Sequence, residues 1–187
     1  MPRPTARPTR AKLTSTGPRL SLGAIRALEQ ELGTEFPAGY RKLMLRTNGG
    51  VPEPGFFVLR ARGKPRVAWV ERLASITSST KDSLNFRGMN AALWRWHVGG
   101  SPCPAGAVSI GSAGPYTDLL LFIAGPRQGE VWLKNWEETS SRADAEGDPE
   151  EGMTRLAETF DEFLGSLETE EEAEAAAKAR GSKGRRK

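Results

Sequence analysis

The chain has little of the chemistry that most catalytic and metal-binding sites need. Its 187 residues include one cysteine, Cys103, and one histidine, His97. A single cysteine excludes a disulfide framework within the chain and fits a reducing compartment. One histidine with one cysteine provides too few ligands for a structural zinc site. The sequence therefore predicts neither a metal centre nor a bound cofactor.

Long apolar runs are missing as well. The longest, "LLLFIA" at 119–124, is far shorter than the roughly 20 residues of a membrane-spanning helix. The N-terminus is basic, but no apolar segment follows it, so it does not read as a secretory signal. We therefore expect a cytoplasmic protein with no membrane contact.

The net charge of +4 is carried by the ends of the chain. Residues 1–17 hold four basic groups and no acid, and residues 168–187 hold six basic groups and five glutamates. Residues 18–167 hold 17 basic and 18 acidic groups, which argues against a nucleic-acid-binding body. We expect a disordered basic arm over 1–17, because it offers little to bury, a folded domain over 18–167 and a charged tail over 168–187.

Apolar residues recur at helical spacing in three segments. A serine N-cap and a glycine stop bracket the first, at 22–32. The second, 37–47, begins with proline and ends at "NGG", 48–50, where left-handed backbone is tolerated. The third, 156–167, is a closing amphipathic helix that 168–180 could prolong without an apolar face.

Strand-like runs lie between these helices. One of them, "DLLLFIA", is apolar on both faces and therefore predicts a central strand that is covered on both sides. Because helices and strands are segregated along the chain, we expect an α+β fold with a mainly antiparallel sheet. The predicted strands are 55–61, 66–73, 107–111, 118–124 and 130–136.

An enzyme is the weakest of three functional hypotheses. Its best version joins Asp118, His97 and Cys103 in one cleft, but Cys103 lies between two prolines, outside any familiar nucleophile motif. The glycine-containing "GSAGPYTD" at 111–118 lacks the phosphate-loop lysine and precedes a strand, so it reads as a turn.

Five tryptophans are more informative than the polar residues. We assign Trp69 and one or two of the others to the core. Trp94 and Trp96 stand beside a loop, and Trp136 ends a strand that runs into acidic residues. Tryptophans at such places are frequent interface anchors.

Three blocks of the sequence resemble the SUKH superfamily, the family of the yeast cell-wall-synthesis regulator and of many bacterial toxin-immunity proteins. The first is a helix ending in "LG", then "FP", a tyrosine three residues later and a helix that closes on "NGG". The second is "AVSIGSAGPYTDLLLFIAGPRQGEVWLKNWEE", and the third is the closing "TFDEFLGSL". The middle segment, 74–102, has no clear counterpart.

This resemblance implies a non-catalytic binding module in which the segment from Pro37 to "NGG" is scaffold. It also implies an immunity protein that binds and blocks a cognate toxin domain, often a nuclease or a deaminase. The alternative is a nucleic-acid-associated or regulatory protein that uses its basic tails as arms.

A partner is expected on the sheet face that the helices leave uncovered, around the glycine-containing turn. Aromatic anchors beside a few charges would give both affinity and orientation. Phe57 and Trp136 have the alternative of being core residues, and Asp118 has the alternative of bracing the turn. The nominated residues are Phe57, Trp94, Trp96, Tyr116, Asp118 and Trp136.

Overall fold

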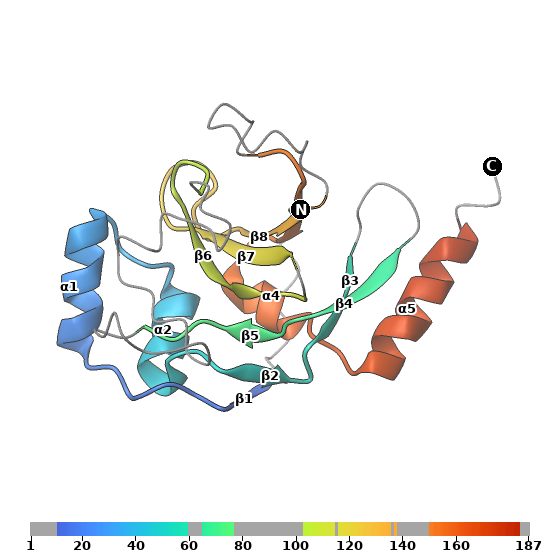
Figure 1. The fold of residues 1–187 in the computed structure, drawn as a ribbon, viewed down its shortest axis with the longest axis horizontal. Coiled ribbons are helices and arrows are strands. Elements are labelled where there is room, and N and C mark those ends of the chain that lie inside the picture. Colours follow the sequence, from blue (N-terminus) through green and yellow to red (C-terminus); the bar gives the residue numbers. More distant parts are fainter. Residues whose placement is uncertain are drawn as a thin grey trace, which may run out of the picture.

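The computed structural model describes residues 11–59, 65–76, 103–114, 116–135, 137 and 150–183. It has the expected mixed α+β architecture, with an antiparallel five-stranded sheet of order β5-β6-β7-β8-β9 (Figure 1). The helices are α1 (Leu22–Leu32), α2 (Ala38–Thr47), α4 (Phe160–Gly165) and α5 (Glu170–Lys183). The strands of the large sheet are β5 (Arg72–Leu73), β6 (Ala107–Ser112), β7 (Thr117–Phe122), β8 (Val131–Asn135) and β9 (Met153–Ala157).

Two smaller antiparallel pairs complete the described strands. One joins β1 (Lys12–Thr14) to β2 (Val51–Glu53), and the other joins β3 (Phe56–Leu59) to β4 (Arg66–Trp69). Helix α5 packs on the second pair, at the opposite end of the molecule from α1 (Figure 1).

The central strand is β7, as its apolar sequence predicts. Leu119 and Leu121 belong to the main hydrophobic core, whereas Leu120 and Phe122 are equally buried outside it. Because side chains alternate along a strand, β7 is buried on both faces.

A chain of aromatic rings connects the helices across the main core. Tyr40 of α2 makes edge-to-face contacts with Phe36 at 5.4 Å and with Phe160 of α4 at 5.1 Å between ring centroids. Phe160 also packs against Phe163, which in turn contacts Phe57 of β3 at 6.0 Å. Aromatic pairs in these geometries stabilise beyond their burial alone. Helices from the two ends of the chain are thereby held on one face of the sheet.

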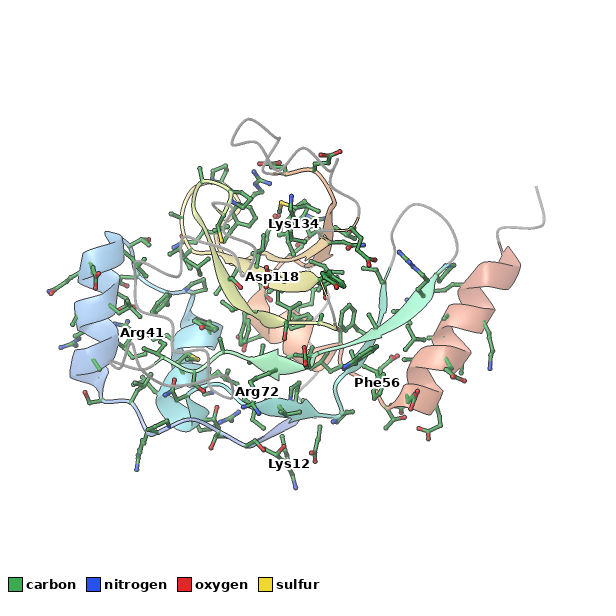
Figure 2. All side chains as sticks on the ribbon, in the orientation of Figure 1. Lys12, Arg41, Phe56, Arg72, Asp118 and Lys134 are labelled. Atoms are coloured by element: carbon green, nitrogen blue, oxygen red, sulfur yellow. The ribbon has the colours of Figure 1, made fainter. Side chains whose placement is uncertain are left out.

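Helices α1 and α2 are joined by one buried carboxylate. Glu29 accepts a hydrogen bond from the Phe36 backbone N–H at 2.8 Å and another from Arg41 Nη2 at 2.7 Å. Glu29 is nearly inaccessible, and Arg41 is labelled in Figure 2 beside α2. A buried charge with both a partner and backbone donors avoids the penalty of an unpaired one.

Three local expectations differ from the structure. Lys12–Thr14 is a strand within the segment expected to be disordered, because it pairs with β2. Leu156 lies in strand β9, so the closing helix is shorter than predicted and begins at Phe160. The segment after Gly165 does not prolong that helix directly, since a new helix, α5, begins at Glu170.

Candidate functional site

The "NGG" segment holds three parts of the chain together. Asn48 ends α2 with φ 47°, and its side chain is fully buried. Its amide donates to the backbone oxygens of Pro18 at 2.7 Å and Ile76 at 2.9 Å, and its Oδ1 accepts from the Ile76 N–H at 2.7 Å. These contacts are internal, so the segment acts as scaffold, in agreement with what the resemblance implies.

The glycine after Asn48 is needed for close approach of the backbone. Gly49 has φ 75°, and a Cβ there would lie 2.5 Å from the Ala74 carbonyl oxygen. No side chain fits at that distance. Gly49 therefore lets the end of α2 pack directly against the chain that follows β5.

The turn between β6 and β7 presents an aromatic side chain to solvent. Thr117 Oγ1 donates to the carbonyl oxygens of Ala113 and Gly114, at 2.5 and 3.1 Å. Tyr116 has φ 58°, and its side chain is 68% exposed. A bulky residue with positive φ is a conformational outlier. The turn thus holds Tyr116 outward in a defined but unfavourable backbone conformation.

Trp69 borders the same turn, which corrects its assignment to the core. It ends β4 and is 45% exposed. Its six-membered ring lies 3.7 Å from the point where a Cβ on Gly114 would stand. Trp69 and Tyr116 are thus two exposed aromatic residues near Gly114. The alternation of side chains along β4 places Trp69 on the same face as Val67. It does not indicate that this end of the strand is exposed to solvent, so the sequence alone assigns Trp69 to the core.

Asp118 lies behind the turn rather than on the surface. It is only 3% exposed and stands directly opposite Lys134 in the β7–β8 register (Figure 2). Lys134 is equally buried, and its ammonium donates to the Glu151 carbonyl oxygen. A buried carboxylate opposite a buried ammonium is a position inside the sheet, so we leave Asp118 out of the candidate surface.

Phe57 is buried in the main core. It is 4% exposed and contacts Phe163, so the core alternative describes it. We therefore leave Phe57 out of the candidate surface. Three other nominated residues, Trp94, Trp96 and Trp136, lie outside the described residues, as does His97.

Cys103 is poorly suited to act as a nucleophile. Burial, and then the negative charge of Asp118, raise the pKa of its thiol to about 12. Because the thiolate is the reactive form, almost none is present at neutral pH. The charge of Asp118 opposes the ionisation that the enzyme hypothesis requires.

Neither a metal cluster nor a membrane-spanning helix is found in the part of the chain that is described. No three histidine, cysteine or carboxylate side chains converge there as metal ligands. No helix there is long and apolar enough to cross a bilayer.

Comparison with known families supports the resemblance seen in the sequence. Residues 19–166 match the model of the SMI1 / KNR4 family (SUKH-1). No curated protein and no solved structure gives a significant match to the chain. Strand β1 and helix α5 lie outside the matched range.

Proposed function

Because the chain belongs to the SMI1 / KNR4 family (SUKH-1), we propose that it is an immunity protein that binds and neutralises a cognate toxin domain. The family supports a non-catalytic module of the immunity or regulatory kind in general. A single cysteine fits the cytoplasm, the compartment in which such a protein would meet its toxin. Toxins with nuclease or deaminase activity are the expected targets.

The observation that carries this proposal is a pair of exposed aromatics, Tyr116 in the β6–β7 turn and Trp69 at the end of β4 beside it. Large hydrophobic side chains exposed among the described residues are Leu22, Trp69 and Tyr116. Trp69 and Tyr116 flank one tight turn, whereas Leu22 stands alone on α1. Rigid tryptophan and tyrosine side chains are the residues that most often dominate binding energy at interfaces.

The first experiment is co-expression with the product of the adjacent upstream gene. We expect that product to be toxic alone, to be tolerated with this protein, and to co-purify with it. A non-toxic product that forms no complex would contradict the proposal.

The second experiment locates the site on the purified complex. We expect Tyr116→Ala and Trp69→Ala each to weaken toxin binding by about 2 kcal/mol or more, measured by calorimetry. Leu22→Ala is the matched control, because it removes an apolar side chain as exposed as Trp69 from a different element. If both aromatic variants bind normally, the site is misplaced.

Trp94, Trp96 and Trp136 are proposed to extend this surface. For the alanine variant of each residue, toxin affinity is measured by calorimetry and stability by the unfolding midpoint. Lost binding with unchanged stability supports a contact role, whereas lost stability with unchanged binding identifies a core residue.

A further inference from the structure

A carboxylate accompanies the two exposed aromatics. Glu71 follows β4, and its backbone N–H donates to the Ser112 carbonyl oxygen at 2.9 Å. Ser112 Oγ in turn donates to Glu71 Oε2 at 3.0 Å. Ser112 directly precedes the turn that contains Gly114, which the ring of Trp69 borders. Trp69, Glu71 and Tyr116 therefore border one turn, and we call these three residues the turn patch.

The Glu71 carboxylate is not neutralised from within the described part of the chain. Glu71 is exposed and makes no ion pair there. Arg72, the nearest cation in sequence, directs Nη1 to the Ser15 carbonyl oxygen at 3.1 Å, on the β1 side of the molecule. Arg66 stands three residues before Trp69 on β4, so the two point to opposite faces of that strand.

The turn sets the backbone of Tyr116, but its side chain makes no contact that explains why a tyrosine stands there. Its ring makes no recorded contact with another described ring, and its hydroxyl makes no hydrogen bond to a described residue. Asn48, by contrast, has a similar φ and three buried hydrogen bonds. Strain that is not repaid inside the molecule is a reason to suspect a function for the residue.

We infer that the turn patch binds a cationic side chain, arginine in preference to lysine, presented by the protein partner. This inference rests on the proposed function and names the chemistry of its contact. Aromatic faces carry partial negative charge and attract a cation above the ring. A guanidinium also stacks flat on such a ring and can form two parallel hydrogen bonds to a carboxylate.

The turn patch also disfavours partners that place no cation next to Glu71. A neutral or acidic surface pressed onto the turn patch would bury the Glu71 carboxylate without a partner. Burying an unpaired charge is costly, so such complexes are disfavoured even where their shape fits. The patch therefore provides specificity together with affinity.

The test uses a small probe, so that it does not depend on identifying the toxin. An acetylated, amidated Gly-Arg-Gly peptide is titrated into the full chain and followed by NMR. We expect shifts at the Trp69 indole N–H and at the backbone amides of 112–114, 116 and 117. The matched probe replaces arginine by citrulline, which keeps the shape and removes the charge. Equal shifts from the two peptides would overturn the inference.

Two variants complete the design. Glu71→Gln should weaken arginine-peptide binding about two- to fivefold, as expected for loss of one exposed charge pair. Glu31→Gln removes an exposed carboxylate from α1 and should change nothing. Unfolding midpoints close to that of the parent protein show that both variants are folded. Unchanged peptide binding by Glu71→Gln also overturns the inference.

The toxin complex separates this inference from the proposed function. If Tyr116→Ala weakens the complex and Glu71→Gln does not, the partner presents no cation, so the inference fails and the immunity function stands. If the arginine peptide binds as expected and no toxin is found, the inference stands and the proposed function fails.

Discussion

Three residues other than glycine have left-handed backbone in the described part of the chain, namely Ser15, Asn48 and Tyr116. Asn48 and Tyr116 show two uses of the same conformation. In Asn48 it aims a buried amide at three backbone groups. In Tyr116 it exposes a ring.

We expect Tyr116→Gly to stabilise the protein and to abolish partner binding. Glycine adopts positive φ at no steric cost, so the free energy of unfolding should rise by about 0.5–1 kcal/mol. Urea denaturation measures this change. Asparagine also tolerates positive φ, so the free energy of unfolding of Tyr116→Asn should lie between those of the parent protein and Tyr116→Gly. A stability loss on replacement by glycine would mean that the tyrosine ring has a structural role.

Asn48→Gly should destabilise the protein by about 2–4 kcal/mol. Glycine keeps the left-handed backbone, so the loss isolates the hydrogen bonds to Pro18 and Ile76, whose buried backbone groups would be left unsatisfied. Asn48→Ala should cost about 1 kcal/mol more, because alanine also strains the backbone. Equal stabilities for the glycine and alanine variants would show that backbone conformation contributes nothing here.

Cys103 should react slowly with a thiol-specific disulfide reagent in the folded protein and rapidly in urea. Because its folded pKa is raised to about 12, the unfolded state releases the thiol proton first as pH rises. This thiol therefore lowers stability above about pH 9, an effect that is absent near neutrality. The difference in unfolding free energy between the parent and Cys103→Ala, followed from pH 7 to pH 10.5, checks this sign. A thiol that reacts equally fast in both states would contradict the assigned burial.

At the scale of elements, the sequence predicts helices with caps better than it predicts short strands. The limits of α1 follow from Ser21, whose hydroxyl accepts from Ala24 N–H, and from Gly33 in left-handed backbone. The apolar spacing that begins at Leu156 is misleading, because pairing with β8 overrides it. Strand β1 likewise forms because it pairs with β2, and no local sequence pattern predicts that pairing.

A signal for the end helices was nevertheless present in the sequence. Thr159 accepts from the Glu162 N–H, and Thr169 accepts from the Glu172 N–H. The Glu172 carboxylate also accepts from the Thr169 N–H, which completes a capping box. Two threonines that are each followed three residues later by glutamate therefore mark two helix starts, and the capping pattern could have separated α4 from α5.

We expect Ala173→Glu to detach α5 from β3 and β4. Ala173 is the residue of this helix that is fully buried, and the helix has no broad apolar face to compensate for its loss. Limited proteolysis should then cleave the chain after α4 at least several-fold faster than in the parent protein. Ala175→Glu adds the same charge at an exposed position of the same helix and should leave cleavage unchanged. Equal protection of both variants would show that α5 is held by other contacts.

At the scale of the whole molecule, the alternative function makes its own prediction. If basic tails bound nucleic acid, removing 1–10 and 184–187 would abolish a salt-sensitive affinity. We expect instead that the truncated chain retains full toxin affinity and an unchanged unfolding midpoint. Fluorescence anisotropy with a single-stranded DNA oligonucleotide at two salt concentrations, beside calorimetry with the toxin, measures both. A salt-sensitive DNA affinity that the full chain shows and the truncated chain loses would favour the alternative.

The sequence anticipates only part of the proposed surface. Tyr116 and the turn that carries it follow from the glycine and proline pattern of "GSAGPYTD". Trp69 and Glu71 do not, because their approach to the turn depends on how the chain leaves β4 and joins β6 at Ser112. Phe57 has both a surface and a core interpretation in the sequence, and its packing against Phe163 decides for the core.

The aromatic chain from Phe36 to Phe163 bears on how the protein is made. Phe36 and Tyr40 are synthesised early, whereas their neighbour Phe160 is added when most of the chain already exists. A growing polypeptide on the ribosome must therefore carry the apolar face of α2 without its final cover until α4 emerges from the exit tunnel. Translation that stops before Phe160 yields a chain that cannot close its core. Such a fragment would aggregate or be degraded, so only copies that are completed reach the folded state.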